Sequence, residues 1–289
     1  MNDADGRFAP SPTGTLHLGN LRTALLAWLF ARSAGGRYLV RMEDLDTGRV
    51  KPGVDEEQLA DLAAIGLDWD GEVVYQSQRL DLYADAIAQL RAAGRVYECF
   101  CTRAEIRAAA SAPHGPLSEG AYPGTCLRLT DAELADKHAS GRPPALRIRA
   151  DAAHVTFTDR LLGPQEGVVD DFVVQRNDGA PAYNLAVVVD DAAQGIGEVV
   201  RGADLVDSTP RQLYLARLLG LSEPRHTHVP LVLGPDGARL AKRHGDVTLR
   251  EVDPAAAREW MARTLGLGSL DPGAFDPATL NREPTRWQS

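Results

Sequence analysis

Residues 7–20 read RFAPSPTGTLHLGN. The first three residues of this stretch predict a short buried strand, and the two prolines that follow exclude both a helix and a central position in a sheet. Gly14 permits the chain to turn, and an apolar helical pattern then runs from near Leu16 to about Ala34. The stretch therefore predicts a strand, a stiff loop and a helix N-terminus, whose unpaired amide groups suit an anion.

His17 and Gly19 lie in the first turn of that predicted helix. A histidine supplies a compact hydrogen-bond donor, and a glycine beside it leaves room for a phosphate group. From position alone, an ordinary strand-to-helix turn with a surface histidine is the simpler explanation.

Length and composition describe an ordinary soluble chain. The 289 residues suffice for one large domain with an insertion, and the longest apolar run is far too short to span a membrane. A net charge of −9 argues against indiscriminate nucleic-acid binding, which needs many Lys and Arg, but it permits a local basic surface. The acidic start lacks the apolar segment of a signal peptide, so we expect a cytoplasmic protein. We also expect a monomer.

A second predicted strand, residues 37–42, ends beside a carboxylate, Glu43. Doubly wound sheets bind ligands beyond the carboxyl ends of their strands, so we expect Glu43 to face the same crevice as His17. A buried carboxylate at a strand end needs a cationic partner. Further along, His226 and His228 could suggest a metal site, but alternation along a predicted strand explains them better.

The three cysteines of the chain all lie between residues 99 and 126. An odd, clustered set points away from disulfides and toward a metal. Cys99, Cys101 and Cys126 supply three thiolates for a tetrahedral zinc. His114 or Tyr122 could complete the set, and histidine is the commoner ligand type. Three unrelated buried cysteines are the alternative explanation.

Residues 17–20, His-Leu-Gly-Asn, resemble the His-Ile-Gly-His motif of class I aminoacyl-tRNA synthetases. The preceding residues 7–14 resemble the form of this region found in glutamyl-tRNA synthetases. The resemblance covers roughly residues 6–246 and implies an α/β fold, namely the Rossmann-type doubly wound parallel sheet of class I synthetases with a zinc-containing insertion. It also implies that L-glutamate and ATP with Mg²⁺ are the substrates.

Further matches to this family follow in chain order. Residues 41–46 fit the pattern Arg-x-Glu-Asp-x-Asp, residues 181–191 resemble a helix that lines the amino-acid pocket, and residues 201–205 fit Arg-Gly-x-Asp-Leu. The resemblance implies a glutamate site made of Arg7, Phe8, Ala9, Pro10, Ser11, Glu43, Tyr183 and Arg201. Within this site, the resemblance implies that the Glu43 carboxylate holds the ammonium group of the substrate. The resemblance also implies an ATP site made of His17, Gly19, Asn20 and Lys242.

The catalytic residues implied by the resemblance are His17 and Lys242. Residues 238–244 occupy the place of the second class I motif, Lys-Met-Ser-Lys-Ser, and retain only its second lysine, as Lys242. A lysine in this loop neutralises the pyrophosphate oxygens as the leaving group gains charge. Arg239 can replace the charge of the first lysine, as a planar fork and not a point charge. Ala241 lacks the hydroxyl of the family serine, which puts one phosphate contact in question.

Three features resemble the glutamyl-queuosine tRNA(Asp) synthetases in particular. The Cys-x-Cys pair is followed by Tyr-x-x-x-Cys at residues 122–126, which implies that the zinc ligands are Cys99, Cys101, Tyr122 and Cys126. Val187 stands where the full-length glutamyl enzymes usually carry asparagine. About forty residues follow the lysine loop, fewer than an added domain commonly has. The resemblance implies glutamate transfer to queuosine at the wobble position of tRNA(Asp), with the anticodon stem-loop bound by the catalytic domain.

Other functions fit the same motifs. They are a shortened ordinary glutamyl-tRNA synthetase, a glutamate-activating ligase with a non-RNA acceptor, and an inactive paralogue that binds RNA, which the degenerate lysine loop favours. We expect residues 1–96 and 151–250 to form the two halves of the catalytic domain. Residues 97–150 are expected to form the zinc-containing insertion, resembling an acceptor-stem-binding domain, and residues 251–289 a short helical tail.

Overall fold

Strands and helices alternate along most of the chain, as an α/β fold requires. A computed structural model describes residues 2–102, 104–106, 121–241, 244–245 and 247–287. Its helices are α1 (Leu18–Ser33), α2 (Val54–Ala64), α3 (Leu80–Ala92), α5 (Asp131–Ala139), α6 (Tyr183–Gln194), α7 (Thr209–Leu219) and α8 (Pro254–Leu265). Its strands are β1 (Gly6–Phe8), β2 (Tyr38–Met42), β3 (Val74–Tyr75), β4 (Val96–Cys99), β5 (Ala145–Ile148), β6 (His154–Asp159), β7 (Gly163–Val168), β8 (Val173–Gln175), β9 (Glu198–Gly202), β10 (Arg225–Val229), β11 (Val232–Leu233) and β12 (Thr285–Arg286).

Parallel strands form the centre of the molecule. β3, β2 and β1 pair in parallel, and so do β9, β10 and β6, with β7 antiparallel at the outer edge. The two groups meet where the Asp5 carbonyl accepts hydrogen bonds from the amides of Gly197 (2.8 Å) and Glu198 (3.0 Å). The resulting strand order, β3-β2-β1-β9-β10-β6-β7, reverses its winding between β1 and β9. Sheets of this kind bind their ligands at such a reversal.

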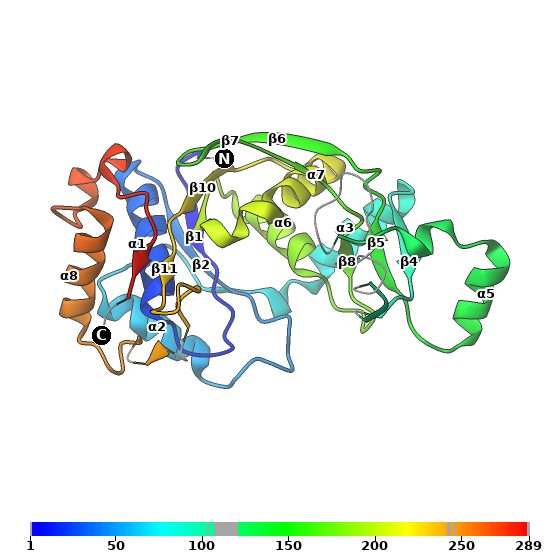
Figure 1. The fold of residues 1–289 in the computed structure, drawn as a ribbon, viewed down its shortest axis with the longest axis horizontal. Coiled ribbons are helices and arrows are strands. Elements are labelled where there is room, and N and C mark those ends of the chain that lie inside the picture. Colours follow the sequence, from blue (N-terminus) through cyan, green and yellow to red (C-terminus); the bar gives the residue numbers. More distant parts are fainter. Residues whose placement is uncertain (1, 103, 107–120, 242–243, 246, 288–289) are drawn as a thin grey trace.

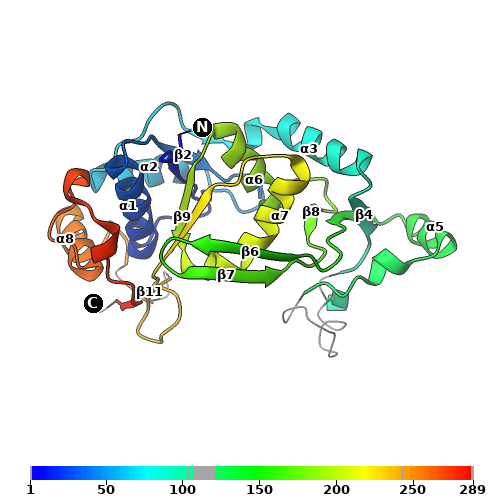
Figure 2. The ribbon, with the colours of Figure 1, turned by 90° about the horizontal axis from the view of Figure 1, so that it is seen from above.

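Helices cover both faces of these strands, which explains why β1 and β2 are buried along their whole length. α1 and α8 lie to one side, and α6 and α7 lie to the other (Figure 1, Figure 2). Two hydrophobic cores result, one between α1, α8 and the strands, and the other among α3, α6 and α7. The predicted doubly wound parallel sheet is confirmed.

A separate antiparallel sheet lies toward the end of the molecule that carries α5 (Figure 1). In this sheet β5 pairs with β4 on one side and with β8 on the other. β8 follows residue 150, so the sheet takes strands from both sides of the expected end of the insertion. The domain boundaries stay a prediction.

The C-terminal segment packs back against α1. Within the expected helical tail, residues 254–265 form helix α8, and β12 pairs in parallel with β11. Arg22, 1% exposed on α1, donates hydrogen bonds to the hydroxyls of Thr264 (3.3 Å) and Thr285 (3.0 Å). One buried side chain therefore joins α8 and β12 to α1. Among the residues that the structure describes, none of the helices combines the length and apolar character needed to cross a membrane.

Candidate active site

A cavity of about 700 Å³ opens at the carboxyl ends of β1 and β9, where the strand order reverses. Its lining includes every described residue that was predicted for the glutamate and ATP sites. These residues are Arg7, Phe8, Ala9, Pro10, Ser11, His17, Gly19, Asn20, Glu43, Tyr183 and Arg201. Lys242, the remaining predicted residue, lies outside the described residues. The fold thus gathers residues from both halves of the chain around one space.

The side chains of His17 and Asn20 cap the first turn of α1. His17 Nδ1 accepts a hydrogen bond from the Asn20 amide (3.2 Å), and Asn20 Oδ1 accepts one from the His17 amide (3.3 Å). The helix therefore begins at Leu18, slightly later than expected. A Cβ atom at Gly19 would lie 3.0 Å from the His17 ring, so glycine permits this close approach. The cap holds the helix N-terminus at the cavity, where its amides suit phosphate oxygens.

Gln58, on α2 and 1% exposed, holds the proline-containing loop in place. Its Nε2 atom donates hydrogen bonds to the carbonyls of Ser11 (3.0 Å) and Gly14 (2.7 Å). From the opposite side, the Glu43 amide donates to the Pro10 carbonyl (2.9 Å). The loop is therefore fixed to α2 and to the end of β2. Sequence reasoning missed Gln58, because a polar residue on an amphipathic helix is ordinarily expected to face solvent.

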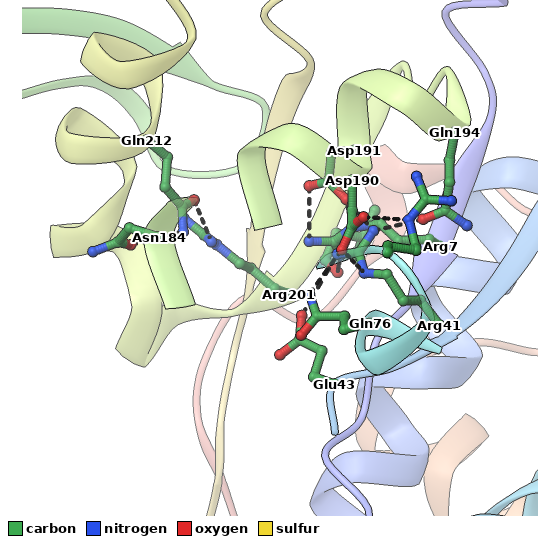
Figure 3. Close-up of polar contacts among 12 residues, drawn as sticks. Arg7, Arg41, Glu43, Gln76, Asn184, Asp190, Asp191, Gln194, Arg201 and Gln212 are labelled. Carbon is green, nitrogen blue, oxygen red and sulfur yellow. Dashed lines mark hydrogen bonds and ion pairs between the residues drawn. The ribbon is translucent and has the colours of Figure 1, made fainter. Parts of the chain in front are cut away.

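Two buried arginines face the cavity from different strands. Arg7 on β1 is 5% exposed, and Arg201 on β9 is 4% exposed. Arg7 Nε lies 3.2 Å from Asp191 Oδ1, and Arg201 Nη1 donates to Gln212 Oε1 at 2.7 Å (Figure 3). Both guanidinium groups are therefore held by side chains of the second half of the chain. Two fixed cations in one cavity suit a ligand that carries two carboxylates.

Adjacent carboxylates at the end of α6, Asp190 and Asp191, support this arrangement (Figure 3). Asp191 accepts a hydrogen bond from Arg41 Nη1 at 2.8 Å as well as pairing with Arg7. Burial acts to raise the pKa of Asp191, but Arg7 and Arg41 hold it below its ordinary value. Sequence reasoning assigned the two aspartates no role. The available signal was the run Val-Val-Val-Asp-Asp, residues 187–191, which places two acids at the end of an apolar helix.

Glu43 lies at the end of β2, with its side chain 11% exposed. One carboxylate oxygen lies 3.5 Å from Arg41 Nη2. Burial raises the pKa of Glu43 to about 7, although Arg41 and Arg7 act to lower it. Arg41 also pairs with Asp190 and Asp191, so its positive charge compensates only part of the negative charge of Glu43. A ligand ammonium in the cavity would supply the rest.

Residues of the lysine loop reach the same cavity. Arg239 lines it and forms an ion pair with Asp204. Arg239 thus brings a cation to the place expected from the sequence, and Asp204 shares that charge. Lys51 also lines the cavity, and no motif identified it. Several cations near a helix N-terminus create an environment that suits a polyphosphate.

Cys99, Cys101 and Cys126 form a compact cluster beside Tyr122. Their Sγ atoms all lie within 4.8 Å of one another. The Tyr122 hydroxyl lies 3.4 Å from Cys99 Sγ and 3.5 Å from Cys101 Sγ. Ligands around one tetrahedral zinc, bonded at about 2.3 Å, lie roughly 4 Å apart, so these atoms fit one ion. The cysteines that could hold a metal are therefore together, whereas His114 lies outside the described residues.

A second cavity, of about 640 Å³, lies between the first cavity and the cysteine cluster. Ser11, Thr13, Glu43 and Tyr183 line both cavities. The lining of the second also includes four arginines, Arg49, Arg142, Arg147 and Arg176. Two carboxylates, Glu43 and Asp46, also line it, and Asp46 lies 4.0 Å from Arg49 and 3.9 Å from Arg176. The arginines outnumber the carboxylates, so the lining is locally basic on a chain of net charge −9.

Comparison with known proteins confirms the resemblance found in the sequence. A model of the family of class I tRNA synthetases (E and Q), catalytic domain, matches residues 4–265. A glutamyl-Q tRNA(Asp) synthetase of Nocardia farcinica is 60% identical over 288 residues, which cover 96% of this chain and 91% of that protein. A glutamyl-Q tRNA(Asp) synthetase of Symbiobacterium thermophilum is 51% identical, over 97% of this chain and 95% of that protein.

Solved structures agree with this assignment. A glutamate tRNA ligase from Elizabethkingia meningosepticum, crystallised with its amino acid, superposes with a TM-score of 0.82 at 30% sequence identity. The match covers 98% of this chain and 66% of that structure, so the chain spans about two thirds of the length of that ligase. The chain therefore belongs to the class I tRNA synthetases of the glutamate and glutamine type and, within them, to the family of glutamyl-Q tRNA(Asp) synthetases.

Proposed function

We propose that this chain activates L-glutamate with ATP to form glutamyl adenylate, and that it transfers the glutamyl group to the queuosine base at the wobble position of tRNA(Asp). The observation that carries the first half is the cavity that holds Arg7, Arg201 and Glu43 together. The similarity to relatives named glutamyl-Q tRNA(Asp) synthetase supports the second half.

L-Glutamate matches the charges of this cavity. Its two carboxylates would pair with the two buried guanidinium groups of Arg7 and Arg201, and its ammonium would pair with the Glu43 carboxylate. Tyr183, at the start of α6, lines the cavity between its two halves and packs beside the same ligand. Because the arginines are fixed by Asp191 and Gln212, the site is organised before the ligand arrives.

The first reaction joins glutamate to AMP. An oxygen of the α-carboxylate attacks the α-phosphorus of ATP, which enters as its Mg²⁺ complex, and the bond from the α-phosphorus to the bridging oxygen breaks to release pyrophosphate. His17 and the amides of the first turn of α1 hold the phosphates, and Lys242 neutralises the leaving group. The chain supplies positioning and charge stabilisation, and no covalent enzyme intermediate forms.

The second reaction moves the glutamyl group to RNA. A hydroxyl oxygen of the queuosine cyclopentene ring attacks the carbonyl carbon of the mixed anhydride and forms the ester bond. The bond from that carbon to the phosphate oxygen breaks, AMP leaves with its electron pair, and the hydroxyl proton is released to solvent. The second cavity provides the approach, since it shares Glu43 and Tyr183 with the first and is lined by arginines such as Arg142 and Arg176 that suit the phosphates of an anticodon stem-loop.

The cysteine cluster holds one zinc ion in this proposal. Cys99, Cys101 and Cys126 are the thiolate ligands, and Tyr122 is the fourth. Four protein ligands would close the coordination sphere, so the ion would be structural: it would fix the wall of the second cavity and supply no chemistry to either reaction.

Amino-acid-dependent exchange of pyrophosphate into ATP, without RNA, tests the first half. Glutamate should support exchange, and glutamine should be rejected on the order of 10⁴-fold in kcat/KM, because it leaves a buried arginine without its anion. Comparable exchange with glutamine would show that the pocket is misassigned. No exchange with any amino acid would favour the inactive RNA-binding paralogue.

A further inference from the structure

Arg201 is held by hydrogen bonds to three parts of the chain. Its Nη1 atom donates to Gln212 (2.7 Å), and its Nη2 atom donates to the Thr209 hydroxyl (2.7 Å) and the Leu205 carbonyl (3.3 Å). Its Nε atom donates to Nε2 of His228 at 3.0 Å. A guanidinium group has five N–H bonds. Four are used in these contacts, and the fifth, on Nη1, remains for the cavity, where Tyr183 also interacts with the guanidinium group.

His228 accepts the bond from Arg201 in one tautomer only. Its Nδ1 atom lies 2.7 Å from Asp159 Oδ2, and both side chains are fully buried. The carboxylate can only accept, so Nδ1 carries the proton and Nε2 is an acceptor. Nε2 accepts from Arg201 Nε at 3.0 Å and also lies 3.3 Å from the Thr209 hydroxyl. Burial lowers the pKa of His228, which favours the neutral ring, although Asp159 acts to raise it.

Asp159 is itself fixed by the backbone. Its Oδ1 atom accepts hydrogen bonds from the amides of Leu161 (3.0 Å) and Leu162 (2.9 Å), and its Oδ2 atom accepts one from the His228 amide (3.0 Å). A chain of defined contacts therefore runs from the turn after β6, through β10, to the arginine on β9.

His226, two residues earlier on β10, provides an internal comparison. Its ring stacks on that of His228, with centroids 6.0 Å apart and an interplanar angle of 6°. It is similarly buried, yet among the described residues neither of its ring nitrogens has a hydrogen-bond partner. Strand alternation accounts for His226, but it leaves the contacts of His228 with Asp159 and Arg201 unexplained.

We propose that His228 is a positioning residue for Arg201, and that Asp159 fixes the tautomer of His228 so that the remaining Nη1–H of Arg201 stays directed at a carboxylate of the amino-acid substrate. The proposal rests on the glutamate-binding role of Arg201 in the proposed function. Without the acceptor, Nε becomes a buried donor with no partner, and the guanidinium group turns to satisfy it. The loss falls on glutamate binding and not on ATP binding.

Two amide substitutions separate the contacts of His228. In His228→Gln the amide reaches the position of Nε2, so it retains an acceptor for Arg201. In His228→Asn the shorter amide reaches only the position of Nδ1, so it retains the contact with Asp159 and loses Arg201. His226→Asn makes the same change at a histidine without these contacts and is the matched control.

Kinetics of pyrophosphate exchange in the 289-residue chain show which contact of His228 affects glutamate binding. For His228→Asn we expect the KM for glutamate to rise about tenfold, equivalent to about 1.4 kcal/mol, with kcat and the KM for ATP within about twofold of the unchanged protein. His228→Gln and His226→Asn should both keep a glutamate KM within about threefold of normal.

A merely structural role would give a different pattern. Equal glutamate KM values for His228→Asn and His228→Gln, or an equal rise in His226→Asn, would overturn the proposal. So would a fall in kcat with the glutamate KM unchanged. If the unchanged protein shows no glutamate-dependent exchange, the proposed function itself has failed, and that result is seen before any variant is compared.

Discussion

Glu43 is buried at a position that disfavours its ionised form, which is the form that the proposed function requires. In the proposed function the carboxylate must be ionised to pair with a substrate ammonium, yet burial raises its pKa to about 7. Arg41 offsets part of this pKa shift, but its guanidinium group also forms ion pairs with Asp190 and Asp191. Glutamate binding should therefore depend on pH in the neutral range.

The KM for glutamate should rise about tenfold as the pH falls from 8 to 6, because Glu43 becomes protonated as the pH falls through 7 and loses its attraction for the ammonium. Pyrophosphate exchange at saturating ATP measures this directly. Neither the ammonium nor the carboxylates of glutamate titrate in that range, so the substrate does not contribute. A glutamate KM independent of pH between 6 and 8 would contradict the assignment.

Glu43→Gln is the control for this pH dependence. Its glutamate KM should be high and flat across the range. The folded-state pKa of Glu43 lies above the ordinary value of 4.5, so the unchanged protein should lose stability as the pH rises from 4.5 through 7, where folding buries a charged carboxylate. Thermal unfolding of Glu43→Gln should lack that loss.

Lys242 is the only intact lysine of its loop, and its role rests on the sequence. Lys242→Ala should lower the exchange rate by on the order of 10²-fold while the KM for glutamate changes little, because the contact forms with charge that develops on the leaving pyrophosphate. Lys137→Ala, on the exposed helix α5, is a matched control that should leave the exchange rate unchanged. An unchanged rate in Lys242→Ala would remove the lysine from the mechanism.

At the scale of elements, the cysteine cluster joins two segments that are separate in sequence. Cys99 ends β4, Cys126 lies in the short helical turn after Tyr122, and the Tyr122 hydroxyl accepts a hydrogen bond from the Cys126 amide (2.8 Å). A metal here would join these two segments to each other. Because β4 belongs to the same sheet as β5 and β8, the metal would also stabilise that sheet. It would stabilise the second cavity without touching the first.

Cys126→Ser should abolish the binding of one zinc per chain, lower the temperature of thermal unfolding and leave RNA-independent exchange nearly unchanged, because the ion stabilises only the insertion. Metal analysis of purified protein, with Tyr122→Phe for comparison, measures this. Tyr122→Phe should retain zinc with weaker affinity, since water can replace the phenol. Full zinc retention in Cys126→Ser would mean that the cysteines are only part of the core.

Local patterns predicted single elements well. The start of α1, the strand before the proline loop and helix α8 were all found within a few residues, because caps, prolines and apolar periodicity act over short distances. The partners of β8 and β12 were not found. β8 joins the sheet of the insertion and β12 pairs with β11, and such pairings depend on contacts between distant segments.

For the whole molecule, too, local patterns were predicted and contacts between distant segments were not. Motifs supplied the residues that line the cavity, because ligand chemistry restricts residue type at those positions. They did not supply the residues that hold those side chains: Asp191 is 184 positions from Arg7 in sequence, and His228 is 27 positions from Arg201. A carboxylate or histidine can support an arginine from any neighbouring element, so only the fold shows which one does.

In the proposed function the two cavities would allow both reactions to occur without release of the adenylate. Glu43 and Tyr183 line both spaces, so an activated glutamate bound in the first would be accessible from the second. The arginines of the second cavity lie on a chain that is acidic overall, and RNA binding should therefore be local to that surface and weaken with salt.

Transfer of labelled glutamate to tRNA(Asp) that lacks its 3′-terminal adenosine tests the central claim most directly. Periodate oxidises the vicinal diols of both queuosine and the terminal ribose, so only removal of the adenosine separates the two acceptors. We predict that label still enters the trimmed tRNA(Asp), and that it does not enter tRNA(Asp) from cells unable to make queuosine. Label that requires the 3′ end and enters tRNA(Glu) would contradict the account and identify a shortened ordinary glutamyl-tRNA synthetase.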